Sequence, residues 1–293
     1  MTVALSLRVH EGLVLATDSA STVMGRLPNG TSAVINVYNN ANKIFNLRKG
    51  SPIGAITWGV GAMAESSIAM LMKALRAQLT EGDSAINPDQ YRMEDIASRV
   101  KEFIFDQHYA AAFADWNPKP DLGFIVAGYS TDGNLPEEYH LEMKEGQLVG
   151  PNLIREGDIA GATWNGQIEA ITRLLVGFSP MLPEIVKETA GLSDDIMVAI
   201  INTLQARLNP QLVQPSMPLK DAIDLATCLV DVAIRFSQFS PGAPLVGGPI
   251  EVAAISKYEG FKWVERKYYY TADLNPETAD VNRNSMGGTA NDH

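Results

Sequence analysis

Two short apolar stretches, Thr2 to Val9 and Gly12 to Asp18, open the chain, and His10-Glu11-Gly12 lies between them. Short apolar runs that are joined by a tight polar turn are typical of a β-hairpin. The same pattern recurs at Lys43 to Leu47 and Ile53 to Trp58, with a polar, Gly- and Pro-containing turn between the two runs. We therefore expect two hairpins in the first sixty residues.

Apolar residues spaced three and four apart then predict helices, because this spacing places them on one helical face. The first helix has its apolar stripe at Ile68, Leu71, Met72, Leu75 and Leu79. Further helices are predicted at about Met93 to Ala112, Gln167 to Val176, Leu192 to Leu208 and Leu219 to Phe236. Strands are predicted at Asp121 to Tyr129, Glu138 to Met143, Asp158 to Thr163, Ile250 to Tyr258 and Phe261 to Tyr268.

Hairpins that alternate with pairs of helices favour a mixed α and β fold in which helices cover antiparallel sheets. We find no internal repeat and no linker, so residues 1–271 are expected to form one domain. The segment Ala272 to His293 is polar and rich in Asn, Asp, Thr and Gly, and it is expected to be disordered.

The composition narrows the classes of partner. Hydrophobic residues make up 46% of the chain and charged residues 19%, which suits a soluble protein with a sizeable core. The net charge of −11 argues against binding to nucleic acid or to an anionic membrane. Arg8, His10 and Glu11 interrupt the opening apolar residues, so we expect no signal peptide and a cytoplasmic location. The single cysteine, Cys228, lies in a predicted helix and is expected to be a buried thiol.

Neither a metal nor a cofactor is expected. His10, His108, His140 and His293 are scattered without the spacing of paired metal ligands. The run Gly59 to Ala64 matches the G-x-G-x-x-A pattern of dinucleotide-binding folds. The strands before it are predicted to form hairpins, however, whereas a dinucleotide-binding unit begins with a crossover to a parallel strand. A close-packed turn is the favoured interpretation of this run.

Three residues near predicted element ends suggest a catalytic site. If Met1 is removed, Thr2 supplies both a hydroxyl nucleophile and an α-amine that can act as its base. Lys43, held in its charged form by Asp18, would lower the pKa of that amine and favour the alkoxide. Each residue also has a plainer interpretation: threonine is common at position 2, Asp18 can stabilise a turn, and Lys43 can be a solvated strand-edge lysine. Together they indicate an N-terminal-nucleophile hydrolase.

The segment Ala16-Thr17-Asp18-Ser19-Ala20-Ser21-Thr22 resembles the start of a proteasome-type β subunit, a family that includes the HslV-like peptidases. The resemblance implies that Thr2 is the catalytic threonine and that Asp18 and Lys43 are its charged partners. It also implies that the main chain at Thr22 pairs with the substrate and that the Gly59 N–H binds the oxyanion. A pocket that reads the substrate side chain would include Ile56.

The resemblance also implies the architecture and the partners. The expected fold class is α+β, a four-layer αββα sandwich of two mainly antiparallel sheets, with an extra helical insertion at about residues 180–215. The expected function is threonine-type hydrolysis of peptides or unfolded proteins inside a homo-oligomeric ring. The resemblance leaves room for an ATP-dependent unfoldase as a partner, although no residue of the chain indicates one.

Two positions depart from the pattern of the family. Gly161-Ala162-Thr163 stands where a serine beside the nucleophile is expected, and Ser237 stands where a second aspartate is expected. These departures keep two alternatives open: a catalytically inactive scaffold subunit and a small-molecule amidohydrolase.

Overall fold

The two predicted hairpins are confirmed, and they belong to two different antiparallel sheets. The first hairpin lies within its sheet, and the second lies at the edge of the other sheet. The structure is a computed structural model that describes residues 2–26 and 32–267, so the predicted tail at 272–293 lies outside the described residues. The first sheet has the strand order β12-β1-β2-β13-β14. Its strands are β12 Gly161–Gly166, β1 Val3–Val9, β2 Gly12–Thr17, β13 Glu251–Ser256 and β14 Gly260–Glu265.

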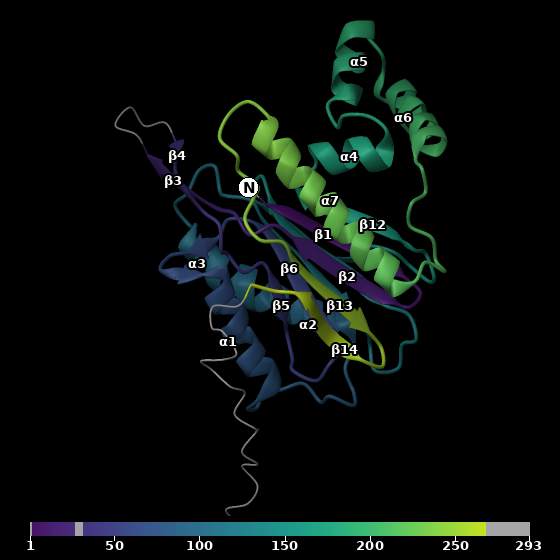
Figure 1. The fold of residues 1–293 in the computed structure, drawn as a ribbon. Helices are drawn as coiled ribbons and strands as arrows, with labels where there is room; N and C mark the ends of the chain where they lie inside the picture. Colours follow the sequence, from purple (N-terminus) through teal and green to yellow (C-terminus); the bar gives the residue numbers. More distant parts are fainter. Residues whose placement is uncertain (1, 27–31, 268–293) are drawn as a thin grey trace, which may run out of the picture.

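The second sheet has the strand order β11-β10-β9-β6-β5, and β5 is its edge strand. Its strands are β11 Gln147–Leu153, β10 Glu137–Lys144, β9 Leu122–Gly128, β6 Ile53–Gly59 and β5 Ile44–Asn46. Two small hairpins lie outside both sheets: β3 Ser21–Arg26 with β4 Ser32–Tyr38, and β7 Ala62–Met63 with β8 Ser66–Ser67. The first of these projects from the end of the molecule near the N-terminus (Figure 1).

Helices cover each sheet on one face. The helix α1 Ile68–Thr80 and the helix α2 Met93–Val100 bury their apolar stripes in one cluster with Phe45, Phe124 and Leu141 of the second sheet. A π-helical segment at Lys101–Tyr109 continues α2 into the short α3 Ala110–Ala112. The helices α4 Glu169–Val176 and α7 Leu219–Phe239 pack with β1 and β2 of the first sheet. The mixed α and β class with antiparallel sheets is therefore confirmed (Figure 1).

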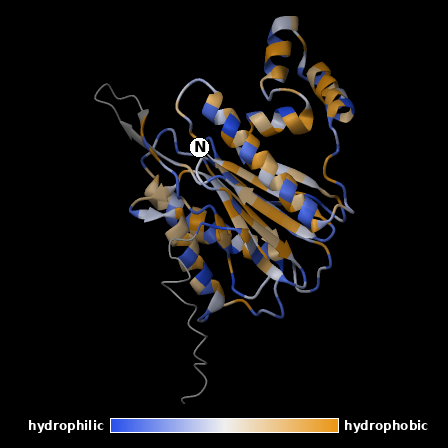
Figure 2. Ribbon diagram, viewed as in Figure 1, coloured by the Kyte–Doolittle hydropathy of each residue, from blue (hydrophilic) through white to orange (hydrophobic). Residues whose placement is uncertain are grey.

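A third apolar cluster joins the facing surfaces of the two sheets. It contains Leu13 and Leu15 of β2, together with Ile44, Ile56 and Ile125 of the second sheet. Because side chains alternate along a strand, the residues between these point to the helices instead. Apolar residues consequently dominate most of the central strands (Figure 2).

Four points expected from the sequence need correction. The helix α5 Leu182–Ala190, which precedes α6 Asp194–Leu208, was not predicted, and neither was β11. The strand expected at 158–163 lies three residues later, at Gly161–Gly166. Cys228 is exposed, because it lies on the opposite side of α7 from the buried Ala222 and Ala226. Within the described ranges, no helix is long and apolar enough to cross a membrane.

Candidate active site

Asp18 follows the last residue of β2 and is completely buried. Its Oδ1 accepts from the backbone N–H of Val3 at 2.9 Å and from Lys43 Nζ at 2.7 Å. Its Oδ2 accepts from the N–H groups of Ala20 at 3.0 Å and Gly247 at 3.1 Å. A carboxylate only accepts hydrogen bonds, and four donors from four segments of the chain satisfy this one. Asp18 therefore fixes the start of β1 relative to Lys43.

Lys43 lies just before β5, and the carbonyl of Lys43 accepts from Thr57 N–H of β6 at 3.0 Å. Its side chain is 6% exposed and reaches Asp18. Burial lowers the pKa of Lys43, because the charged form loses hydration, and the charge of Asp18 opposes that shift. The structure thus brings together two of the predicted catalytic residues, which lie 25 residues apart in the sequence.

Thr2 lies immediately before β1 and is 4% exposed. Its carbonyl accepts from Gln167 N–H at 2.7 Å, while Thr17 Oγ1 donates to the carbonyl of Val3 at 2.7 Å. Together with the Val3 N–H bond to Asp18, these contacts hold the backbone at residues 2–3 from three directions. Gly166 lies against Thr2 with φ +82°, and a Cβ at Gly166 would lie 1.9 Å from the Thr2 carbonyl oxygen. The close approach explains why glycine occupies this position.

This register corrects the expectation about Ala162. In the β1–β12 pairing Val3 lies opposite Gly166, whereas Ala162 lies opposite Leu7, well along the strand from Thr2. The residues beside Thr2 are therefore Gly166 and Gln167. Ala162 does not adjoin Thr2, so its lack of a hydroxyl says nothing about whether the site is active. Ser237 lies near the end of α7, the end that approaches the N-terminus in Figure 1.

The predicted oxyanion donor lies at the end of β6. Gly59 has φ +94°, and a Cβ there would lie 2.2 Å from the Asp121 carbonyl oxygen. Thr57 N–H points to Lys43, and alternate residues of a strand direct their N–H groups to the same side. The Gly59 N–H therefore points to the β5 side of β6, the side on which Lys43 lies. Trp58 turns away from that side, with its ring against Gly123.

The two residues predicted to bind the substrate, Ile56 and Thr22, do not lie together with the Lys43–Asp18 pair. Ile56 is fully buried in the cluster between the sheets, so it packs in the core and lines no open pocket. Thr22 is half-buried on β3, opposite Val37 of β4, and belongs to neither large sheet. The preceding residue, Ser21, lies close to Gly61 just after β6, so the start of β3 adjoins the end of that strand.

A second buried ion pair adjoins the first and was missed in the sequence. Lys267 Nζ lies 3.1 Å from Glu251 Oε2, and these side chains are 7% and 1% exposed. Lys267 also donates to Ser19 Oγ at 2.6 Å and to the Ala41 carbonyl at 2.5 Å. One signal was available: Glu251 is a charged residue at the start of an otherwise apolar strand. Lys267 gave none, because it directly follows two other charged residues, Glu265 and Arg266, at the end of β14.

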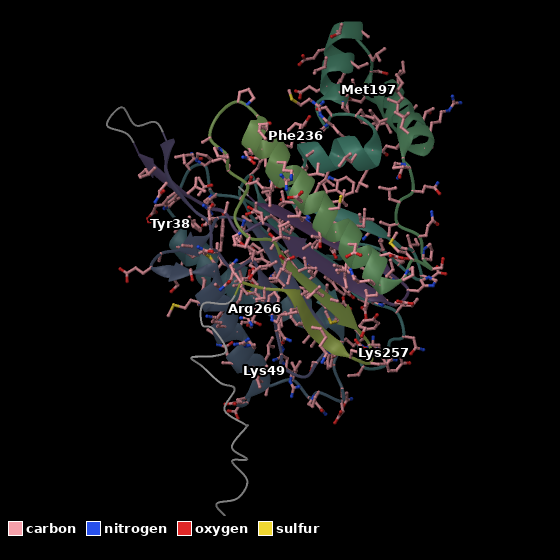
Figure 3. The ribbon with its side chains drawn as sticks, in the orientation of Figure 1. Tyr38, Lys49, Met197, Phe236, Lys257 and Arg266 are labelled. Atoms are coloured by element: carbon pink, nitrogen blue, oxygen red, sulfur yellow. The ribbon has the colours of Figure 1, made fainter. Side chains whose placement is uncertain are left out.

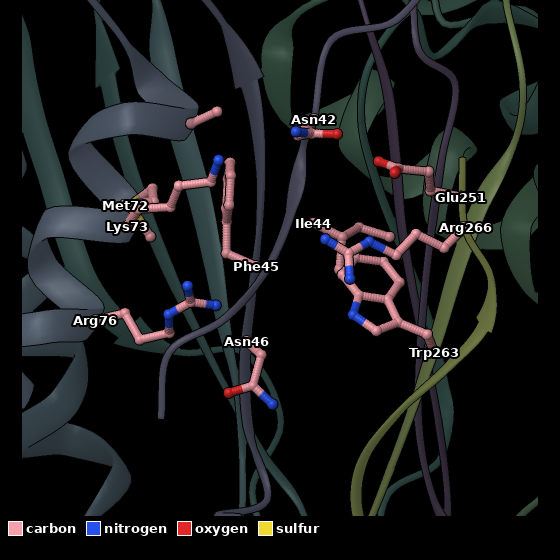
Figure 4. Close-up of a pocket in the computed structure, with 11 residues that line it drawn as sticks. Asn42, Ile44, Phe45, Asn46, Met72, Lys73, Arg76, Glu251, Trp263 and Arg266 are labelled. Carbon is pink, nitrogen blue, oxygen red and sulfur yellow. The ribbon is translucent and has the colours of Figure 1, made fainter. Parts of the chain in front are cut away.

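A small pocket of about 60 Å³ opens beside these ion pairs, between α1 and β14. Figure 4 shows Arg76 on one side and Arg266 on the other, with Asn42 and Glu251 above them. Asn42 directly precedes Lys43, so the pocket begins one residue from the first ion pair. Over the described part of the chain, no group of three or more His, Cys, Asp or Glu residues could hold a metal ion.

No protein-family model and no curated protein sequence matches the chain. Among solved structures it is similar to the Anbu complex from Pseudomonas aeruginosa, seen in a helical assembly. That match has 12% identity and a TM-score of 0.48, and it covers 93% of this chain and 90% of the other. It is also similar to a Gly-1 mutant of Anbu from Hyphomicrobium sp. strain MC1, with 15% identity, a TM-score of 0.49, and coverage of 94% and 92%.

These comparisons correct the resemblance drawn from the first sixty residues. The expected match to proteasome-type β subunits and HslV-like peptidases is not found, since no model of any family matches and the similar structures described above are Anbu proteins. At these identities and TM-scores, the similarity gives no information about the chemistry of this chain. The proposals below therefore rest on the geometry of its own residues.

Proposed function

We propose that this chain is a hydrolase that uses Thr2 as its N-terminal nucleophile and cleaves peptide bonds. The observation that supports this most strongly is the single Asp18 oxygen that accepts from both Val3 N–H and Lys43 Nζ. Through that oxygen the positive charge of Lys43 lies beside the start of β1. Positive charge there favours a neutral α-amine and a threonine alkoxide, which are the two species that the chemistry needs.

In the proposed reaction, removal of Met1 frees the α-amine of Thr2. The amine takes the proton of Thr2 Oγ while the oxygen attacks the peptide carbonyl, and it then returns the proton to the departing amine. The Gly59 N–H donates to the developing oxyanion. Water next attacks the resulting ester, which releases the acid and restores the Thr2 hydroxyl. Lys43 and Asp18 hold the charge of the site and do not exchange protons.

The architecture belongs to the same proposal. We take residues 1–271 as one domain with four layers, αββα, and the segment at about 180–215 as a helical insertion. Three separate apolar clusters support the layering, one between the sheets and one under each set of helices. The insertion is supported by α5, which buries no residue, and by α6, which buries only Met197.

A homo-oligomer that encloses its sites completes the proposal. Large apolar side chains are exposed on neighbouring helices, as on Ile185 of α5, Val198 of α6, and Phe236 and Phe239 of α7. Figure 3 marks Met197 and Phe236 at this end of the molecule. Large apolar side chains that several helices leave exposed are compatible with a surface that a partner covers. A second copy of the chain is the occupant that we expect, and sedimentation of the purified protein measures it.

Hydrolysis of fluorogenic peptides and of an unfolded protein tests the function. We expect turnover by the wild type, none by Thr2→Ala, and partial activity for Thr2→Ser, because serine keeps the hydroxyl and the amine. Equal turnover by Thr2→Ala would refute the nucleophile. Cleavage of small acyl amides without cleavage of peptides would support Thr2 as the nucleophile but would show that peptides are not the substrate.

A further inference from the structure

Lys267 joins three segments of the chain beside the candidate site. Its ammonium donates hydrogen bonds to Ser19 Oγ and to the Ala41 carbonyl. It also forms an ion pair with the carboxylate of Glu251 on β13. Ser19 directly follows Asp18, and Ala41 lies two residues before Lys43. A single side chain therefore ties together the two turns that present the Lys43–Asp18 pair.

The same two turns are also joined by the backbone, since Ala41 N–H donates to the Ser19 carbonyl at 2.9 Å. Glu251 Oε2 makes no well-directed hydrogen bond among the described residues, so its contact with Lys267 is that of an ion pair. In a buried setting each of these charges is stable only while the other is present. The two ion pairs thus form one buried group of two cations and two anions.

Ser19 and Lys267 do not form a second nucleophile and base. Ser19 is completely buried, and its Oγ donates to the Pro249 carbonyl at 2.6 Å. Burial lowers the pKa of Lys267 and the charge of Glu251 opposes that shift, but the only hydroxyl that Lys267 contacts among the described residues is this buried one, which no substrate reaches. A structural and electrostatic role remains for this lysine.

We propose that Lys267 is a positioning residue that fixes the Lys43–Asp18 pair and, balanced by Glu251, sets the charge around Lys43. This inference deepens the proposed function and assigns two residues that lie more than two hundred positions from Thr2. The groups that act on Lys43 are Asp18, Lys267 and Glu251, and those that act on Lys267 are Glu251, Asp18, Lys43 and Arg266.

The direction of each effect follows from charge. Lys267 lowers the pKa of Lys43, and Glu251 raises it. Lys267→Met removes a positive charge and leaves Glu251 unbalanced, so it should raise the pKa of Lys43. Glu251→Gln should move that pKa in the opposite direction. The double variant Lys267→Met/Glu251→Gln removes one charge of each sign and should return the pKa close to the wild-type value.

The test is the titration of Lys43, followed by NMR in protein labelled with ¹³C-lysine and assigned with Lys43→Arg. Lys262→Met is the matched control, because Lys262 is an exposed lysine on β14 and its loss should leave the titration of Lys43 unchanged. Opposite shifts in the two single variants and recovery in the double variant are the expected result. Shifts of the same sign, or no recovery, would overturn the inference.

Two features keep the test decisive. The double variant retains the neutral balance of the buried group, and together with Glu251→Gln it still gives a shift and its reversal if Lys267→Met does not fold. The titration also needs neither turnover nor a free Thr2 amine. If Lys43 responds as expected while no form of the protein hydrolyses peptide, the positioning role stands and the proposed function fails. If the protein is active, the acid limb of its pH profile should move to higher pH in Lys267→Met. Loss of a positive charge should raise the pKa of the Thr2 α-amine, and this amine must be neutral to act as the base.

Discussion

Lys43 Nζ donates to Asp18 Oδ1 at 2.7 Å, and the two side chains are 6% and 0% exposed. The pair joins the end of β2 to the start of β5, and hence the first sheet to the second. Asp18 uses the same oxygen to accept from Val3 N–H, so the pair also holds the residue that follows Thr2. A change in either member should therefore affect both stability and the candidate site.

Removal of Lys43 should be strongly destabilising. Lys43→Met leaves the Asp18 carboxylate buried without its cation, and breaking a buried pair costs about 3–5 kcal/mol. The free energy of unfolding in urea measures the effect. Lys49→Met is the matched control, since Lys49 is exposed in the turn between β5 and β6 and should change that free energy by less than about 0.5 kcal/mol. Similar losses in the two variants would show that the buried pair has no special role.

A methyl group at Gly166 should displace Thr2. Gly166→Ala brings a Cβ against the Thr2 carbonyl oxygen and also places alanine at φ +82°. Gly146→Ala has nearly the same strain, with φ +78°, but its Cβ meets nothing within 4 Å. Both variants should lose about 1–2 kcal/mol from the left-handed backbone. Only Gly166→Ala should lose several kcal/mol more and all hydrolytic activity. Equal loss of stability and activity in the two variants would contradict the close approach at Thr2.

Buried tyrosines should make the fold sensitive to alkali. Burial raises the pKa of Tyr129 to about 12, above the ordinary value of about 10, because the phenolate loses its hydration. The stabilisation is therefore fully present below about pH 10 and is lost as the pH rises toward about 12, by up to about 3 kcal/mol. Tyr129→Phe should flatten this decline in urea unfolding at alkaline pH. Tyr258→Phe, which changes an exposed tyrosine, should leave the decline unchanged.

Local patterns were sufficient to predict most elements of this fold. The hairpins β1–β2 and β5–β6 and the helices α1, α4, α6 and α7 follow from apolar periodicity and turn residues, since these signals lie within a few residues of each element. The helix α5 is nine residues long, and its apolar residues Leu182, Ile185 and Val186 make only a short stripe, none of which is buried. Its existence was therefore not evident from the pattern.

The candidate site was only partly predictable. Thr2, Asp18 and Lys43 lie near element ends in one short stretch, where residue type and order are informative. The neighbours of Thr2 depend instead on the register between β1 and β12, and a shift of a few residues replaces Ala162 by Gly166. Glu251 and Lys267 enter the site through strand pairing at the other end of the chain. No local pattern could connect them to Asp18.

The most direct test of the central claim is the intact mass of the purified protein before and after treatment with a peptide epoxyketone. This reagent closes a ring with both a threonine Oγ and a free α-amine, so it reports both requirements of the proposed site together. We predict a chain that has lost Met1 and gains one adduct, and no adduct in Thr2→Ala. A chain that retains Met1 and gains no adduct, or an adduct that persists in Thr2→Ala, would contradict the assignment of Thr2 as the nucleophile.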